Sequence, residues 1–245
     1  MRKLSRRQTL AAMVAAGASV AAQRARAASV AASSRVSFLL VNDIYRIDEN
    51  RDGRGGMARF AAVVKAERAR ALAEGRRLIC VHAGDTLSPS LLSSFDQGAH
   101  MIDLFNDVGL DVFVPGNHEF DFGKDNYFER MGEARFPILA TNLKDAAGLR
   151  LARHQDQILI EVDGLKLALV GAAYEATASA SRPGDLVFGS TIPAVLAAAK
   201  SARAAGADLV IAIVHADKAT GTALMNTHAV DLILSGHNHD LHIDF

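Results

Sequence analysis

The sequence has a single cysteine, Cys80, among its 245 residues. No disulfide can form within the chain, which excludes a small disulfide-stabilised scaffold. A lone cysteine also suits an oxidising compartment, because no thiol there has to stay reduced. The chain lacks a formal net charge as well, and half of its residues are apolar. A disordered protein would have more net charge and fewer apolar residues, so we expect one or two folded domains with a sizeable core.

The charges are unevenly distributed along the chain. Residues 1–27 hold six basic side chains and no acidic one, so the remainder has a net charge of −6. The backbone of a nucleic acid is itself negative, and an acidic body therefore argues against a nucleic-acid polymer as the main partner.

The sequence also lacks an apolar run near its start that is long enough to span a bilayer. The run from Leu10 to Ala22 is shorter than the roughly 20 residues a span needs, and it is mostly alanine. Arg6 and Arg7 precede it, and a small-x-small cleavage pattern follows at 25–27. A paired arginine before such a run is typical of twin-arginine export in bacteria. The alternative is an amphipathic N-terminal helix.

We therefore predict three segments. Residues 1–27 are a signal peptide that engages the twin-arginine export machinery, 28–34 a short linker, and 35–245 the folded domain. The mature protein is expected in the periplasm or outside the cell, with no membrane insertion after the signal peptide is cleaved.

After residue 34, short apolar runs alternate with segments of helical periodicity. Strands are expected at 35–41, 78–82, 112–114, 138–140, 158–162, 165–170, 209–214 and 232–234. Helices are expected at 57–74, 99–108, 126–133 and 194–205. Asp163-Gly164 predicts a two-residue hairpin. Alternating elements with one hairpin predict an α/β domain with mixed sheets.

Polar residues follow five of the predicted strands at the point where each strand ends. A single Asp in such a place is usually a turn or a helix cap. Five strand ends together favour a ligand site, because ligands of open α/β folds bind beyond the carboxyl ends of the strands. The residues concerned are Asp43, Asp85, Asn117, His118, His215, His237 and His239.

Carboxylate, amide oxygen and imidazole together suit Mn, Fe, Zn or similar divalent ions, and thiolate is absent from the set. Seven candidate ligands are too many for one tetrahedral ion and about right for two. Two ions about 3.5–4 Å apart can share a bridging carboxylate and a bridging hydroxide.

Three of these segments resemble the signatures of the calcineurin-like metallophosphoesterases in order and spacing. They are Gly84-Asp85, the run 116–119 (GNHE) and the run 236–239 (GHNH), and His215 stands where that family has a histidine. The longer string 116–123 and Gly55-Gly56 look like the secreted 5′-nucleotidase and 2′,3′-cyclic-nucleotide phosphodiesterase branch. The resemblance covers about residues 35 to 245. It implies a four-layer α/β/β/α sandwich.

The resemblance also implies a role for each ligand of two divalent ions, such as Mn, Zn, Fe or Co. Asp85 would bridge the ions, and Asp43 and His239 would hold the first. The residues implied for the second ion are Asn117, His215 and His237.

By the same resemblance, His118 would face the phosphate and the leaving oxygen, oriented by Asp121. Imidazole suits that role, since it can donate to developing charge near neutral pH. The implied activity is hydrolysis of a small phosphoester, a nucleotide monoester or a related cyclic ester, by a metal-bridging hydroxide.

The sequence departs from the family in two places. Tyr45 stands where the family usually has a histidine, and three roles are open to it: a phenolate ligand, a hydrogen bond to a metal-bound water, or neither. The chain stops at Phe245, so we expect a fragment that lacks the C-terminal substrate domain, or a protein reduced to its metal half.

Two other functions remain open: a non-catalytic family member that binds metal or phosphate, and a sulfur-compound hydrolase on the same scaffold. His118 and Asp121 favour the enzyme, because a mere metal binder has little use for them. Outside this set, His82 is interpreted as a packed histidine or a support for a ligand. His242 is interpreted as part of a strand after the last motif.

Overall fold

The structure is a computed structural model that describes residues 36–244. The predicted signal peptide (1–27) and linker (28–34) lie outside the described residues. Among the helices of residues 36–244, none combines the length and the apolar character that a membrane span requires.

The first sheet has five parallel strands in the order β1-β2-β3-β4-β6. Its strands are β1 (Val36–Val41), β2 (Arg77–His82), β3 (Val112–Phe113), β4 (Ile138–Leu139) and β6 (His154–Gln155). The longest pairing joins β1 and β2, whose registers match over six residues from Val36↔Arg77 to Val41↔His82. Their carboxyl ends therefore lie side by side.

The second sheet has four strands in the order β11-β10-β8-β7 and is mixed. Its strands are β7 (Gln157–Val162), β8 (Leu165–Ala172), β10 (Leu209–His215) and β11 (Leu232–Gly236). β8, β10 and β11 are parallel, and β7 is antiparallel to β8 across the predicted Asp163-Gly164 turn. A small antiparallel pair, β5 (Leu143–Lys144) and β9 (Val187–Phe188), lies apart from both sheets.

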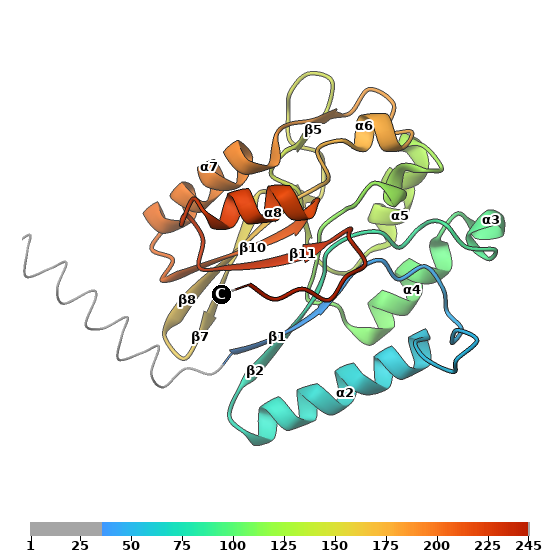
Figure 1. Cartoon of the computed structure of the whole chain (residues 1–245), viewed down its shortest axis with the longest axis horizontal. Helices are drawn as coiled ribbons and strands as arrows, with labels where there is room; N and C mark the ends of the chain where they lie inside the picture. Colours follow the sequence, from blue (N-terminus) through green and yellow to red (C-terminus); the bar gives the residue numbers. More distant parts are fainter. Residues whose placement is uncertain (1–35, 245) are drawn as a thin grey trace, which may run out of the picture.

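Helices cover the outer face of each sheet, as Figure 1 shows. The first sheet is covered by α2 (Met57–Ala73), α4 (Ala99–Val108) and α5 (Lys124–Glu133). The second is covered by α7 (Thr191–Ala204) and α8 (Lys218–Met225). Three short helices lie in connections: α3 (Ser93–Asp96), the 3-10 helix η1 (His118–Phe120) and α6 (Thr177–Ala180).

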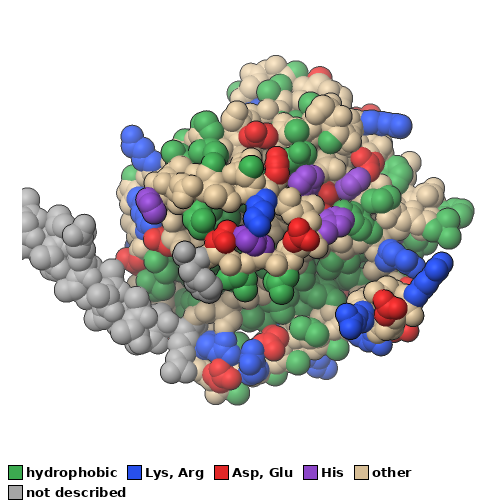
Figure 2. Space-filling model, viewed as in Figure 1, with side chains coloured by type: hydrophobic (Ala, Val, Ile, Leu, Met, Phe, Trp, Pro, Cys, Tyr) green, Lys and Arg blue, Asp and Glu red, His purple; other side chains and the backbone are tan. Residues whose placement is uncertain are grey.

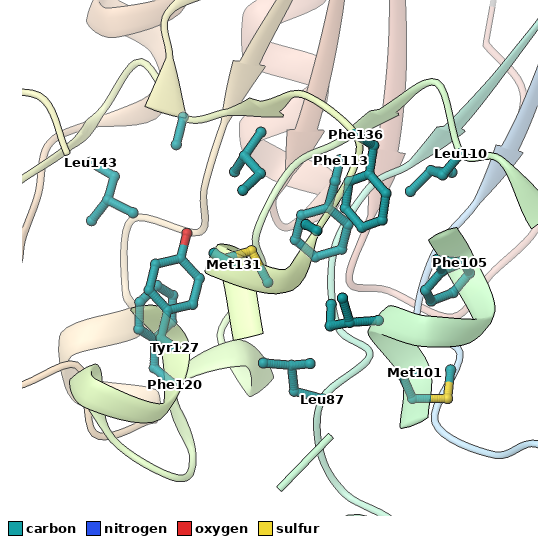
Figure 3. Close-up of a cluster of buried hydrophobic side chains, with 14 of the residues drawn as sticks. Leu87, Met101, Phe105, Leu110, Phe113, Phe120, Tyr127, Met131, Phe136 and Leu143 are labelled. Atoms are coloured by element: carbon teal, nitrogen blue, oxygen red, sulfur yellow. The ribbon is translucent and has the colours of Figure 1, made fainter. Parts of the chain in front are cut away.

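Three hydrophobic clusters join the four layers. One packs α4 and α5 on the first sheet and includes Phe105, Phe113 and Tyr127, all fully buried (Figure 3). A second, rich in alanine, packs α7 on the second sheet. The third lies between the two sheets and is built from β-branched and leucine side chains such as Val81 and Ile213. These clusters confirm the four-layer α/β/β/α sandwich.

Every strand and helix expected from periodicity forms, with ends shifted by a few residues. The elements that were not predicted are α3, η1, α6, α8 and the two-residue strands β5, β6 and β9, mostly too short to show a period. The prediction of a further strand around His242, which did not rest on periodicity, is wrong. Residues 241–244 have no regular structure, and β11 pairs only with β10 among the described strands.

The backbones of the two sheets come into direct contact where β4 meets β8. The backbone N–H of Thr141 donates to the carbonyl oxygen of Gly171 at 2.7 Å. A Cβ at Gly171 would lie 2.7 Å from the carbonyl oxygen of Leu139 and closer still to its side chain.

We predict that Gly171→Ala lowers the free energy of unfolding by about 1–3 kcal/mol, because the extra methyl has to push the sheets apart. The matched control is Gly132→Ala in α5, where a Cβ meets nothing within 4 Å and removal of a flexible residue should stabilise by about 0.4–1 kcal/mol. Urea unfolding of both variants measures this. Equal stability of the two would contradict the close approach.

Candidate metal centre

The polar residues at the strand ends meet where the carboxyl edges of the two sheets face each other. β1 leads to Asp43, β2 to Asp85 and β3 to Asn117, all from the first sheet. From the second sheet, β10 ends at His215 and β11 leads to the run 237–239. Histidine and acidic side chains gather in the middle of the face that Figure 2 shows.

Asp85, His215 and His237 form a compact group whose ligand atoms all lie within 4.8 Å of one another. His215 Nε2 lies 3.1 Å from Asp85 Oδ2 and 3.2 Å from His237 Nδ1. The Nδ1–H of His215 donates to the carbonyl oxygen of Ala83 at 2.7 Å, so Nε2 is the ring nitrogen that faces the group. This arrangement could hold a divalent ion.

Asp43, Tyr45 and His239 form a second group beside the first. Asp43 Oδ1 lies 2.9 Å from His239 Nε2 and accepts a hydrogen bond from the Tyr45 hydroxyl at 3.0 Å. The side chain of Asp43 is only 5% exposed, and that of His239 is 60% exposed. Asp43 is therefore buried, whereas His239 is open to solvent.

Asp85 connects the two groups. One carboxylate oxygen, Oδ2, contacts His215 of the first group and lies 3.4 Å from the Tyr45 hydroxyl of the second. The other oxygen, Oδ1, accepts the backbone N–H of His118 at 2.8 Å. The Asp85 side chain is buried, so its carboxyl group lies out of solvent between the two groups.

The environment of each group acts on its pKa values. Burial raises the pKa of Asp43, but hydrogen bonds from Asn42 and from the backbone of His237 outweigh it and hold this pKa below its usual range. Asp43 is thus ionised at neutral pH. Burial lowers the pKa of His237, and the neighbouring His215 lowers it further, so this imidazole is neutral. Ionised carboxylate and neutral imidazole are the forms that bind metals.

Tyr45 points its hydroxyl into the second group, 3.3 Å from His239 Nε2. Burial and the charges of Asp85 and Asp43 raise the pKa of this phenol, so it stays protonated without a bound cation. In this structure the phenol donates to Asp43.

Asn117 supplies an acceptor with no partner. It is 6% exposed, and its Oδ1 has no hydrogen bond within residues 36–244. A buried amide oxygen without a donor costs free energy unless something satisfies it. The carboxylates, the imidazoles and this unpaired amide oxygen are ligand types that suit Mn, Fe, Zn or Co. A bound ion would also satisfy the unpaired oxygen.

Strained backbone accompanies these residues. Asp43, Asp85, His237 and His239 all have φ between 54° and 90°, a region that non-glycine residues rarely adopt. Such conformations cost about 1–3 kcal/mol each and collect at functional sites. The chain therefore adopts this conformation after three strands, β1, β2 and β11, where it carries the candidate ligands.

His118 and Asp121 form a pair beside the candidate ligands. The Nδ1–H of His118 donates to Asp121 Oδ2 at 2.6 Å, and the Ser181 hydroxyl donates to Asp121 Oδ1 at 2.6 Å. The hydrogen bond to Asp121 raises the pKa of His118 to about 9. A hollow of about 480 Å³ beside this pair is lined by Asp121, Phe122 and residues 179–182.

Glu119 holds the loops that carry the candidate ligands, a role the sequence did not reveal. It is fully buried and accepts the backbone N–H groups of Asp85, Thr86 and Gly116 at 2.6–2.8 Å, and that of Leu87 at 3.3 Å. Burial raises its pKa to about 7, with the Asp85 charge adding to the shift. The one available signal was its place directly after His118 in the 116–119 motif.

His82 is packed, as interpreted. Its ring lies between Phe105 and Phe113 at centroid distances of 4.8 and 5.2 Å, and its Nδ1 accepts the backbone N–H of Gly84 at 3.1 Å. Complete burial lowers its pKa to about 3, so it is neutral.

We predict that Glu119→Gln lowers the free energy of unfolding by about 1–3 kcal/mol, because the new amide group turns a donor toward backbone donors. Glu161→Gln is the control, since that side chain is exposed on β7 and should change stability by less than about 0.5 kcal/mol. Urea unfolding compares them. Indistinguishable midpoints would show that Glu119 does not hold the loops.

Comparison with known proteins agrees with this geometry. A family model described as calcineurin-like phosphoesterase matches residues 36–241. A probable 5′-nucleotidase of Treponema pallidum is 30% identical over 192 residues, which are 77% of this chain and 32% of that protein.

Two solved structures have the same fold. The NAD nucleotidase of Haemophilus influenzae superposes with a TM-score of 0.75 at 24% identity, over 85% of this chain and 39% of that one. A sulfate thiohydrolase of Thermus thermophilus gives a TM-score of 0.71 at 31% identity, over 77% of this chain and 35% of that one.

The chain spans about a third of the length of these relatives. Within that span, the family model covers nearly all described residues, including every candidate ligand. The chain therefore belongs to the calcineurin-like phosphoesterase family.

Proposed function

We propose that this protein is a phosphoesterase with two divalent ions that hydrolyses nucleotide phosphomonoesters or related cyclic phosphoesters. One observation carries the proposal. Candidate ligands from the carboxyl ends of both sheets converge on the buried carboxylate of Asp85, which contacts both groups.

The chain's own residues divide into two ligand sets that share Asp85. Asp43 and His239, from the group that contains Tyr45, would hold the first ion, and Tyr45 would lie beside it as a neutral phenol. His215 and His237, from the other group, are proposed for the second ion together with Asn117. When bound, the two ions supply a hydroxide nucleophile at neutral pH and neutralise charge on the phosphate oxygens.

His118 is proposed as the general acid. Its Nδ1–H is held by Asp121, so the imidazole has one fixed orientation and presents Nε2 away from that contact. From Nε2 it would donate a proton to the oxygen of the departing alcohol, and Asp121 would stabilise the charged ring. The hollow beside Asp121 offers space for the alcohol.

The substrate class is proposed from the relatives. The protein of Treponema pallidum is named a probable 5′-nucleotidase and that of Diplobatis ommata a 5′-nucleotidase. The second is 26% identical over 223 residues, which are 85% of this chain. A small nucleotide rather than a nucleic-acid polymer also agrees with the net charge of −6 after residue 27.

A second candidate is a sulfur-compound hydrolase. The observation that favours it is the sulfate thiohydrolase of Thermus thermophilus, which at 31% identity exceeds the 24% of the NAD nucleotidase. A nucleoside monophosphate and an S-sulfonated thiol, assayed with the same protein, separate the two candidates.

Replacement of His118 and of Asp85 tests the proposed roles. We predict that His118→Asn keeps both ions but lowers kcat by about 10²–10⁴-fold, because it removes only a proton donor. Asp85→Asn should lose or disorder both ions, since it touches each ligand set. Metal analysis of the purified variants, with turnover measured alongside, decides between these outcomes. The same loss of metal in both variants would contradict the assignment.

Export and domain limits are part of the proposal. Residues 1–27 are proposed as a twin-arginine signal peptide, 28–34 as a linker and 35–245 as the domain, which places the mature protein in the periplasm or outside the cell. Replacing Arg6 and Arg7 by lysine should leave the protein in the cytoplasm, because the export machinery reads the arginine pair. Cell fractionation measures this, and unchanged delivery of the double variant would refute it.

A further inference from the structure

An aromatic side chain outside the proposed ligand sets covers one of the candidate ligands. Tyr174 follows β8, and its ring stacks on the imidazole of His237 with centroids 4.3 Å apart and planes 30° from parallel. β8, β10 and β11 are neighbours in the second sheet. Three rings at the ends of these strands therefore form a cluster: Tyr174, His237 and His215, with 5.0 Å between the two histidine centroids and 6.2 Å between those of Tyr174 and His215.

The two histidines of this cluster are held in different ways. A metal-binding histidine normally donates its second ring N–H to a carboxylate or a carbonyl oxygen, which fixes the orientation of the ring. His215 does so, through Nδ1 to Ala83. Within residues 36–244, the only hydrogen-bonding contact of the His237 ring is its Nδ1 with His215 Nε2, so Nε2 has no such support.

Hydrogen bonding fixes the backbone of His237, whereas the orientation of its ring depends on stacking against Tyr174. Its N–H donates to Asp43 Oδ2 at 3.0 Å, and its φ of 90° sets the direction in which the side chain leaves. Rotation about the Cβ–Cγ bond stays open unless a neighbour blocks it. The face of Tyr174 is that neighbour, and it keeps Nδ1 turned toward His215 and Asp85.

We propose that Tyr174 is a positioning residue, which orients His237 through ring stacking and thereby sets the affinity of one of the two ions. The inference rests on the metal centre proposed above. Stacking needs the ring and not the hydroxyl, so phenylalanine should replace tyrosine here and an aliphatic residue should not. Partners that orient metal ligands typically contribute about 10–100-fold to metal affinity.

Tyr174 can be changed without removing a core residue. Its side chain is only partly buried. The connection that follows is held by its carbonyl oxygen, which accepts the N–H of Thr177 at 3.2 Å and the Thr177 hydroxyl at 2.6 Å. Those contacts persist with any side chain at position 174.

The experiment compares Tyr174→Leu, Tyr174→Met and Tyr174→Phe in the full chain. Binding of Mn²⁺ is measured by titration calorimetry, and the absorption spectrum of bound Co²⁺ reports the geometry of its ligands. Both aliphatic variants should bind one ion about 10–100-fold more weakly and change the Co²⁺ spectrum. Tyr174→Phe should match the parent in both readouts.

Phe128→Leu is the matched control, because it removes a ring that is 36% exposed and packs on Tyr127 in α5. It should leave both affinities unchanged. Parental affinity in both aliphatic variants would overturn the role of Tyr174 and leave the proposed centre standing. An equal loss in Tyr174→Phe would overturn the stacking explanation, since the hydroxyl would then matter. A parent that binds no ion would contradict the metal centre itself, and the role of Tyr174 with it.

Discussion

The buried carboxylate of Asp85 is the interaction on which the candidate site depends. It contacts His215 from the second sheet and the Tyr45 hydroxyl from the first, and it accepts the backbone N–H of His118. A fully buried negative charge is costly unless cations or donors surround it. Two divalent ions would supply that compensation, and Glu119 fixes the loop that presents the carboxylate by accepting its backbone N–H.

The close approach of the loops explains why small residues surround this carboxylate. A Cβ at Gly84 would meet the backbone of Gly116 and the ring of His215, and a Cβ at Gly116 would lie 2.7 Å from His215 Cε1. The two glycines thus let loops from one sheet reach a histidine from the other. The four-layer fold supplies the frame, because both sheets turn their carboxyl ends to the same place.

Much of the fold was predictable from the sequence, because long strands and helices leave a clear periodicity. The hairpin at Asp163-Gly164 and helix α4 are examples. The convergence of strand ends also indicated which residues would meet. Glu119 could not be found in this way, since its role depends on four backbone N–H groups brought to it by the fold. Tyr174 was missed for a related reason: its partner, His237, lies 63 positions away on another strand.

The central claim is that two divalent ions share Asp85. Anomalous diffraction at the manganese absorption edge, from crystals grown with Mn²⁺, tests it most directly. The account predicts two peaks about 3.5–4 Å apart, one beside Asp43 and His239 and the other beside His215 and His237, with the Asp85 carboxylate between them. A single peak, or peaks that leave Asp85 without a metal contact, would contradict it.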